Sequence, residues 1–239
     1  MKEALLNMPP EKFGKYFDHT LLKAHVSNDD FKRFCEEGVK CCAKILAVNS
    51  AALKLCKSLL EGHDIQIGAA IGFPLGQTTV ETKAFETIDS IKNGADEIDY
   101  VINIVELKSK NYSYIENEML KIVNICREKN VISKVIFENC YLDDDEKKLL
   151  CEISNKVKPD FIKTSTGFGT GGATIKDIEL MRKYADSFIK IKASGGIKTF
   201  DDAAAMIQAG AERIGTSSTV SIMEEFIVNQ YENYPACRK

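Results

Sequence analysis

The sequence predicts an α/β protein with the fold of a single (β/α)8, or TIM, barrel. Short apolar runs alternate with stretches in which apolar residues recur at helical spacing, and eight such pairs follow one another at fairly even intervals. A chain of 239 residues suits eight units and can bury a large core. No linker or low-complexity segment interrupts it, so we expect one domain over residues 1–239. A doubly wound open sheet is the alternative architecture.

The expected strands are short apolar runs bounded by turns. In order they cover Lys15–Thr20, Cys41–Asn49, Ile65–Phe73, Glu97–Asn103, Ile132–Asn139, Asp160–Phe168, Phe188–Gly196 and Arg213–Ser217. The third run is apolar throughout, as expected for a strand buried on both faces.

The expected helices follow the strands and carry apolar residues at helical spacing. In order they cover Asp29–Glu37, Ala51–Leu60, a segment from Thr78 or Thr79 to Lys92, Tyr112–Lys129, Asp143–Val157, Ala173–Tyr184, Asp201–Ala209 and Val220–Tyr231. Ser27 or Asn28 could cap the first helix, and Thr78 or Thr79 the third. Since barrels of this class carry their sites on the loops after the strands, we expect functional residues at the carboxyl ends of the strands.

Charge and hydropathy limit the partners of this chain. It has 32 basic and 35 acidic residues, a net charge of −3 and no long basic run, so neither nucleic acid nor an anionic membrane is expected to bind. Met1–Pro10 is too short and too charged for a secretory signal, and no apolar run approaches the ~20 residues of a membrane span. We expect a cytoplasmic protein.

Cysteine and histidine spacing predicts no metal site. The eight cysteines are scattered without a Cys-x-x-Cys motif and should be reduced thiols. Cys41 and Cys42 would point to opposite sides of a strand, so we expect no disulfide between them. His19, His25 and His63 form no ligand pair, which argues against a zinc site.

Two lysines are the main chemical signal. Lys163 and Lys192 lie in the sixth and seventh expected strands, each a few residues before a glycine-containing loop. A second ammonium nearby and burial both favour the neutral amine, which can attack a carbonyl and form a Schiff base. The alternative is a pair of structural lysines bridged to buried carboxylates.

The segments around these lysines resemble a known family. They read Asp160-Phe-Ile-Lys-Thr-Ser-Thr-Gly167 and Ile191-Lys-Ala-Ser-Gly-Gly-Ile-Lys198. Further segments with the same resemblance are Phe17–Lys23, Ile71–Gly76, Gly94–Asp99, Lys134–Glu138 and Arg213–Ser218. In this order they resemble the motifs of deoxyribose-phosphate aldolase, and they span residues 17–218.

The resemblance implies reversible cleavage of 2-deoxy-D-ribose 5-phosphate to D-glyceraldehyde 3-phosphate and acetaldehyde, in the catabolism of deoxyribonucleotides and without metal or organic cofactor. It implies that Lys163 forms the Schiff base, that Lys192 lowers the pKa of Lys163, and that Asp99 is the acid/base group. Asp18 would relay protons or orient Lys192; alternatively it is a satisfied carboxylate near a strand end. The alternatives are a Schiff-base aldolase for another sugar phosphate and a sugar-phosphate-binding protein without turnover.

Strand alternation predicts a charged barrel interior. We expect four inward acids to face four inward lysines, namely Asp18, Glu97, Asp99 and Glu138 against Lys134, Lys163, Lys190 and Lys192. This set balances, as buried charges nearly must. Glu97 and Lys190 begin their strands and are assigned to the barrel floor.

The phosphate is expected on the loops after strands seven and eight, where such barrels commonly bind phosphate. These loops supply Gly195, Gly196, Gly215, Ser217 and Ser218. The resemblance adds Gly167 and Lys198.

The chain departs from the family pattern in three places. Ala47 and Ser50 replace a cysteine and a proline that the family often has, and Phe168 replaces a lysine found in some members. Some members also end in a catalytic tyrosine, for which Tyr231 and Tyr234 are candidates. We expect a homodimer, although the sequence identifies no interface.

Overall fold

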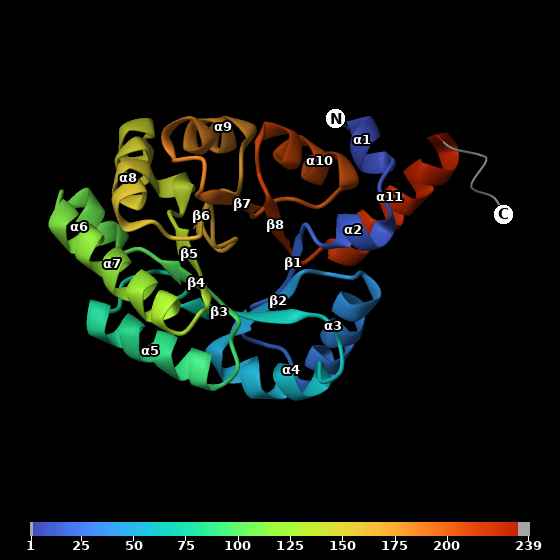
Figure 1. Cartoon of the computed structure of the whole chain (residues 1–239), viewed down its shortest axis with the longest axis horizontal. Helices are drawn as coiled ribbons and strands as arrows, with labels where there is room; N and C mark the ends of the chain where they lie inside the picture. Colours follow the sequence, from blue (N-terminus) through green and yellow to red (C-terminus); the bar gives the residue numbers. More distant parts are fainter. Residues whose placement is uncertain (1, 234–239) are drawn as a thin grey trace.

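Eight parallel strands close into a barrel in the computed structural model, which describes residues 2–233. The strands are β1 (Phe17–Leu21), β2 (Ile45–Asn49), β3 (Gln66–Ile71), β4 (Glu97–Val101), β5 (Ile132–Ile136), β6 (Phe161–Lys163), β7 (Lys190–Ser194) and β8 (Arg213–Thr216). Each pairs with its neighbours in chain order, and pairing of β1 with β8 closes the barrel inside a ring of helices (Figure 1). The predicted barrel is confirmed, and the open sheet is wrong.

The helices are α1 (Lys2–Leu6), α2 (Pro10–Gly14), α3 (Asn28–Lys40), α4 (Leu53–Leu59), α5 (Val80–Lys92), α6 (Ile104–Lys108), α7 (Tyr112–Glu128), α8 (Asp144–Val157), α9 (Ile175–Tyr184), α10 (Phe200–Ala209) and α11 (Thr219–Asn233). Two 3₁₀ turns, η1 (Ser50–Ala52) and η2 (Asn139–Tyr141), follow β2 and β5. The sequence missed α1, α2 and α6 because five residues are too few for helical periodicity. No helix within residues 2–233 is long and apolar enough to cross a membrane.

Side-chain caps begin both helices for which the sequence predicted a capping residue, α3 and α5. The hydroxyl of Ser27 accepts a hydrogen bond from Asp30 N, and the Asp30 carboxylate accepts one from Ser27 N. This reciprocal pair satisfies backbone donors that the first turn leaves free. Thr79 caps α5 by accepting from Thr82 N. Ser27 and Thr79 are therefore the caps, and the alternatives Asn28 and Thr78 are wrong.

Two strands that carry the site end at least three residues earlier than the sequence predicts. β5 ends at Ile136 and β6 at Lys163, where Asn139 and Phe168 were expected. Beyond them the backbone turns at Glu138, with a φ of 47°, and at Gly167, with a φ of 86°. Left-handed conformations cannot continue a strand. Lys163 is therefore the last residue of its strand and lies at the rim of the barrel.

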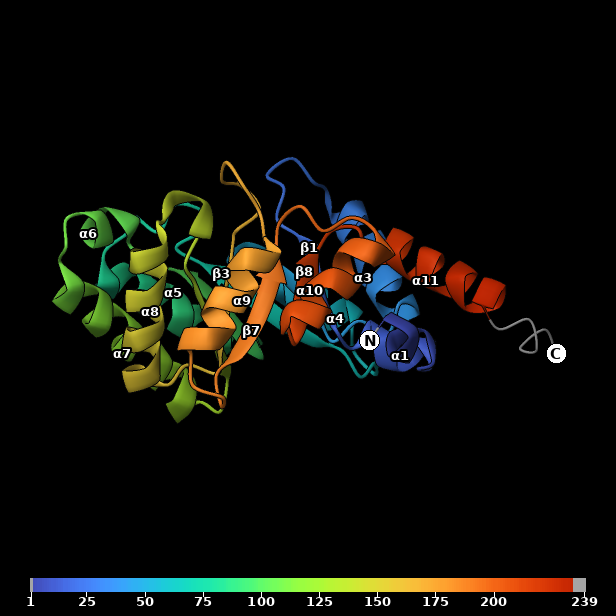
Figure 2. The ribbon, with the colours of Figure 1, turned by 90° about the horizontal axis from the view of Figure 1, so that it is seen from above.

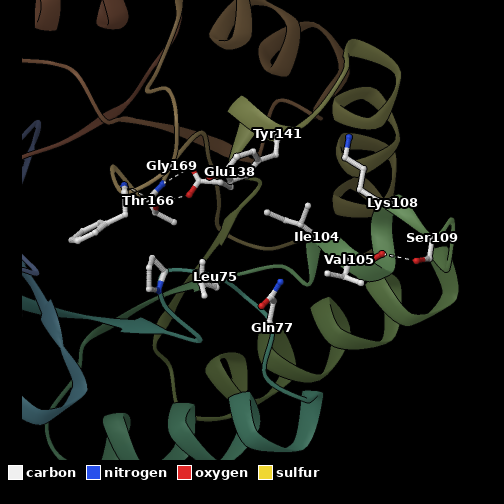
Figure 3. A pocket seen from close by; sticks show the side chains of 12 residues that line it. Leu75, Gln77, Ile104, Val105, Lys108, Ser109, Glu138, Tyr141, Thr166 and Gly169 are labelled. Atoms are coloured by element: carbon white, nitrogen blue, oxygen red, sulfur yellow. Dashed lines mark hydrogen bonds between the residues drawn. The ribbon is translucent and has the colours of Figure 1, made fainter.

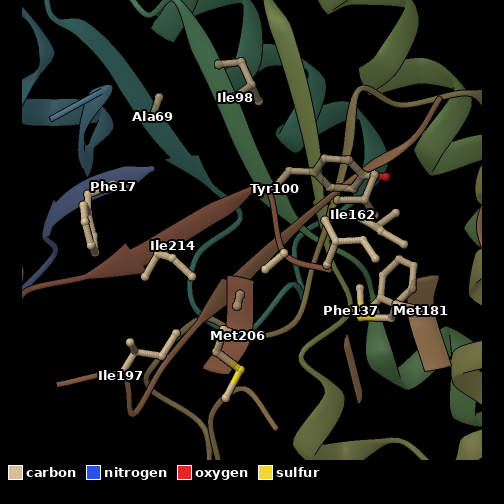
Figure 4. Packing of buried hydrophobic residues seen from close by; sticks show 14 of the residues in the cluster. Phe17, Ala69, Ile98, Tyr100, Phe137, Ile162, Met181, Ile197, Met206 and Ile214 are labelled. Carbon is tan, nitrogen blue, oxygen red and sulfur yellow. The ribbon is translucent and has the colours of Figure 1, made fainter. Parts of the chain in front are cut away.

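Outward-facing strand residues form an apolar layer beneath the helices. Ile98 and Tyr100 from β4, Ile162 from β6 and Met181 from α9 are fully buried in this layer (Figure 4). Burial of each such side chain contributes about 1.5–3 kcal/mol to folding. Residues between them on the strands point inward, and the strand register brings Lys163 level with Lys192. Apolar residues thus stabilise the wall while the interior carries charge.

An aromatic cluster covers the junction between the first and last strands. The ring of Phe13, from α2, stacks on Phe226 with centroids 4.3 Å apart and meets the edges of Phe17 and Phe200 at 5.1 and 5.6 Å. These residues come from α2, α11, β1 and α10. Helix α2, near the amino terminus, is therefore packed against α11, near the carboxyl terminus.

Replacing Phe13 with alanine should destabilise the barrel by about 3–5 kcal/mol, because the change removes a fully buried ring and leaves a cavity. Urea denaturation measures the loss. The same change at half-exposed Phe188 is the control and should cost about 0.5 kcal/mol or less. Equal losses at both positions would show that the aromatic cluster does not hold the junction.

Candidate active site

Three lysine side chains converge on the carboxylate of Asp99 inside the barrel. Oδ2 of Asp99 accepts hydrogen bonds from Lys163 Nζ at 2.8 Å and from Lys192 Nζ at 2.7 Å. Oδ1 accepts one from Lys134 Nζ at 2.5 Å. Strand register explains the convergence, because Asp99 lies beside Lys134 and Lys163 beside Lys192 on neighbouring strands.

A second layer of charge lies beneath Asp99, toward the amino-terminal ends of the strands. Lys134 Nζ lies 2.5 Å from an oxygen of Glu97. The Arg213 guanidinium donates to Asp18 at 2.5 Å and to Glu97 at 3.1 Å. Asp18 also pairs with Lys192. The two layers form one buried network, which we call the charge cluster.

Arg213 takes the place that the sequence assigned to Lys190. Lys190 is exposed at the start of β7, where its ammonium lies 5.6 Å from the ring centre of Phe161. Its expected inward position is wrong, because the first residue of this strand still projects into solvent. Arg213 begins β8 on the same inward side as Gly215, and this alternation was the signal that the sequence analysis missed.

Glu138 is buried but lies outside the charge cluster. Its carboxylate accepts hydrogen bonds from the backbone and the hydroxyl of Thr166. The expected inward alternation past Ile136 fails because the left-handed backbone at Glu138 redirects the side chain.

The charge cluster contains one more base than acid. Its members are Asp18, Glu97 and Asp99 with Lys134, Lys163, Lys192 and Arg213. Burial of a net charge is costly, so loss of one proton from one lysine balances the cluster. The predicted balance of four acids against four lysines is wrong, because Glu138 and Lys190 do not belong to the cluster. With Arg213 included, the excess of one base favours a neutral lysine.

Lys163 loses its proton more easily than an ordinary lysine. Burial lowers the pKa of Lys163 to about 8. The positive charge of Lys192 also lowers this pKa, whereas the carboxylate of Asp99 raises it. Burial also opposes the charge of Lys134, but Asp99 and Glu97 outweigh it and hold the pKa of Lys134 above its usual value. A neutral amine is therefore available at Lys163 near neutral pH.

The carboxylates of Asp99 and Asp18 remain ionised. Burial alone would raise the pKa of Asp99, but Lys134, Lys163 and Lys192 hold it well below its usual range. The pKa of Asp18 is lowered as well, because Lys192 and Arg213 outweigh the effect of burial. An ionised Asp99 beside a neutral amine can accept a proton from a bound hydroxyl.

Lys163 borders a cavity of about 770 Å³ at the barrel mouth. The loops after β6, β7, β8 and β1 and the end of β8 form the wall, and the lining includes all seven residues predicted to hold phosphate, Gly167, Gly195, Gly196, Lys198, Gly215, Ser217 and Ser218. Gly215, which the sequence placed in a loop, lies within β8. Of the charge cluster, Lys163 alone belongs to the lining that the structure describes. Lys192 is fully buried behind it.

The glycines that line this cavity are needed for different physical reasons. Gly167, Gly195 and Gly196 have φ between 80° and 86°, a region that other residues rarely adopt. A Cβ on Gly196 would meet nothing within 4 Å, so its backbone faces open space. A Cβ on Gly215 would lie 2.9 Å from Cε of Lys192. Gly215 therefore leaves room for Lys192.

The departures from the family pattern have local explanations. Phe168, half-exposed on the cavity wall, meets the ring of Phe73 edge-on at 5.3 Å. Ser50 begins η1 and donates to Glu86, and Ala47 is buried in β2. Tyr231 is exposed near the end of α11 and does not belong to the cavity lining, while Tyr234 lies outside the described residues.

Potential metal ligands do not gather in residues 2–233, where no group of three or more His, Cys, Asp or Glu side chains could hold a metal ion. The cysteines described there, Cys41 and Cys42 among them, are free.

Comparison with known proteins agrees with this geometry. Residues 14–223 match the model of the DeoC/LacD family aldolases. The chain belongs to this family. It is thus an aldolase, a lyase that forms and breaks carbon–carbon bonds.

Similar proteins share nearly the whole barrel. A deoxyribose-phosphate aldolase of Lactobacillus acidophilus is 53% identical over 214 residues, which is 90% of each chain. The solved structure of an aldolase described as QR15 has a TM-score of 0.86 and 37% identity, and covers 92% of this chain and 97% of its own. A deoxyribose phosphate aldolase from Aeropyrum pernix, described as a tetramer, also has a TM-score of 0.86, with 29% identity over 95% of this chain and 96% of its own.

The pKa of Lys163 gives a testable pH dependence. The acidic limb of kcat/KM should have its midpoint near pH 8, because the protonated amine cannot attack a carbonyl. Lys192→Met should move this limb upward by about 1 pH unit, since it removes a neighbouring positive charge and leaves Asp99 free to stabilise the Lys163 ammonium. The control is Lys190→Met at the exposed start of β7. An unmoved limb in Lys192→Met would mean that burial alone sets the pKa.

Proposed function

We propose that this aldolase reversibly splits 2-deoxy-D-ribose 5-phosphate into D-glyceraldehyde 3-phosphate and acetaldehyde. In this proposal the reaction belongs to deoxyribonucleotide catabolism, and residues 1–239 form a single domain. The observation that carries the proposal is the position of Lys163. It is the base that titrates near pH 8 and the member of the charge cluster that borders the cavity. The aldolase of Lactobacillus acidophilus is named for this substrate, which supports the assignment.

The first step joins Lys163 to the open-chain sugar. The neutral Nζ attacks the C1 aldehyde, and loss of water from the carbinolamine leaves an iminium. Lys192 and Lys134 donate hydrogen bonds to Asp99 and hold its carboxylate next to the reacting nitrogen. The iminium replaces a metal as the electron sink, so the proposed chemistry needs no metal and no organic cofactor.

The second step breaks the bond between C2 and C3. Asp99, directly or through a water molecule, takes the proton from the C3 hydroxyl while the electron pair of the C2–C3 bond moves into the iminium. D-Glyceraldehyde 3-phosphate leaves, and the enamine on Lys163 gains a proton at C2. Hydrolysis then releases acetaldehyde. We assign Asp18, which contacts Lys192 and Arg213, to orienting Lys192 beneath this centre.

The phosphate binds, in this proposal, where the segments after β6, β7 and β8 line the cavity. The backbone N–H groups of the glycine loops, at Gly167, Gly195, Gly196 and Gly215, would approach the anion together with the hydroxyls of Ser217 and Ser218 and the ammonium of Lys198. Lys198 is exposed and supplies the full charge in this chain, where Phe168 replaces a lysine found in some members.

We further propose that the protein is a cytoplasmic homodimer. Its described cysteines are free thiols, as a reducing compartment favours. On α5, Phe85 is 72% exposed and Ile88, one turn later, 51%. An apolar face of this kind suits contact with a second copy. The reported tetramer of the Aeropyrum pernix aldolase shows that a relative self-associates. Light scattering at micromolar concentration tests the dimer, and a monomer would contradict it.

Borohydride trapping tests the nucleophile. With substrate present, reduction should inactivate the enzyme irreversibly and add mass at Lys163, because the substrate forms its iminium on this residue and borohydride reduces it to a stable secondary amine. Tryptic mapping locates the label. Asp99→Asn is the matched variant: it should still be trapped yet lose cleavage, since only the proton acceptor is removed. Labelling confined to Lys192, or a wild-type enzyme without aldolase turnover in a coupled assay, would overturn the mechanism.

Ser217→Asp tests the phosphate position. A carboxylate there would repel the anion, so kcat/KM for the phosphorylated substrate should fall by about 10–100-fold while free deoxyribose is spared. Ser58→Asp, with the same charge change on α4 outside the cavity lining, is the control. Comparable losses with both sugars would mean that the phosphate binds elsewhere.

A further inference from the structure

We propose that Glu138 is a positioning residue that fixes the loop after β6 and thereby the binding of the phosphorylated end of the substrate. The inference rests on the proposed phosphate position. It assigns a function to a buried carboxylate that the charge cluster leaves out.

Backbone hydrogen bonds show an extra residue at Glu138. Phe137 N donates to the carbonyl of Lys163 at 3.0 Å, and Asn139 N donates to the carbonyl of Thr164 at 2.8 Å. Between these two hydrogen bonds the segment after β5 advances by two residues, from 137 to 139, while the segment after β6 advances by one, from 163 to 164. One extra residue on one side of a strand pair is a β-bulge. Glu138 takes up the difference with φ 47° and ψ 63°, a conformation unfavourable for a residue with a side chain. Such a backbone persists where surrounding contacts require it.

The contacts that require it are made by one carboxylate. Oε1 of Glu138 accepts a hydrogen bond from Thr166 N at 3.1 Å, and Oε2 accepts one from the Thr166 hydroxyl (Figure 3). The hydroxyl oxygen in turn accepts from Phe168 N at 3.0 Å. Hydrogen bonds to a buried ionised group are strong, so this chain of contacts fixes the turn at residues 166–168.

That turn begins three residues after Lys163 and continues into the proposed phosphate site. It contains left-handed Gly167, and the loop then packs on the glycine loop after β7. A Cβ on Gly172 would lie 2.1 Å from the carbonyl oxygen of Gly195. Ala173 N donates to that same carbonyl at 3.0 Å. The loop rises from the barrel mouth in Figure 2, on the same side as the loop between β1 and α3.

Glu138 acts through Thr166 and not on the substrate. Thr166 lines the cavity that Lys163 borders, and Glu138 does not. The carboxylate belongs to the wall of a neighbouring, mostly apolar cavity of about 470 Å³ that also contains Leu75 and Tyr141 (Figure 3). Loss of the carboxylate should therefore loosen the loop and leave the chemistry at Lys163 in place.

Glu138→Gln tests this role. It keeps the shape and removes the charge, so KM for 2-deoxyribose 5-phosphate should rise about tenfold, the difference between charge-assisted and neutral hydrogen bonding, while kcat/KM for free deoxyribose changes less than about threefold. Glu179→Gln on the exposed face of α9 is the matched control and should change neither value. Equal losses with both sugars would overturn the inference.

Thr166 provides a second, independent measurement. Thr166→Val removes the hydroxyl that Glu138 binds and should reproduce the rise in KM, whereas Thr166→Ser keeps the hydroxyl and should restore it. In the double variant Glu138→Gln/Thr166→Val, KM should rise little more than in either single variant, because both changes break the same contact between residues 138 and 166. Fully additive losses would overturn the inference. The Ser217→Asp variant separates failure of the phosphate proposal from failure of this inference, because residue 217 does not contact Glu138.

Discussion

The carboxylate of Asp99 is the interaction on which the interior of this barrel depends. Three lysines point at it from β5, β6 and β7, and none of them could stay buried beside the others without a negative charge between them. Even with this carboxylate, the charge cluster contains one more base than acid. Because the least costly way to remove the excess is to deprotonate a lysine, structural stability and a reactive amine have a common origin.

The barrel makes this cluster possible by separating its charges from water except at the mouth, where Lys163 borders the cavity. Outward-facing residues such as Ile98 and Ile162 fill the layer beneath the helices. Arg213 forms the floor, where it pairs with acids from two other strands. Even the space for Lys192 depends on a missing side chain, at Gly215 of the next strand. The low effective dielectric that results strengthens each ion pair and lowers the pKa of Lys163.

The rim follows a different principle, since here backbone conformation matters more than packing. Lys163 reaches the cavity because β6 ends at that residue, and the left-handed residues that follow turn the chain across the mouth. Glycine accounts for most of these turns without a steric cost. Glu138 is the exception, and its bulge joins β5 to the loop of β6. The buried charges below thus remain fixed while the loops above form a concave binding surface.

The sequence by itself determined the barrel, the lysine pair and Asp99, because strand alternation and β/α periodicity are local properties that any reader of the chain can follow. It also identified the glycines and serines of the mouth from their position after strands seven and eight. Only the tertiary structure decided which charges meet. Lys190 and Arg213 each begin a strand, yet one projects into solvent and the other lies within the barrel. Glu138 left the cluster because a single bulge reverses the direction of a side chain, and alternation cannot foresee a bulge.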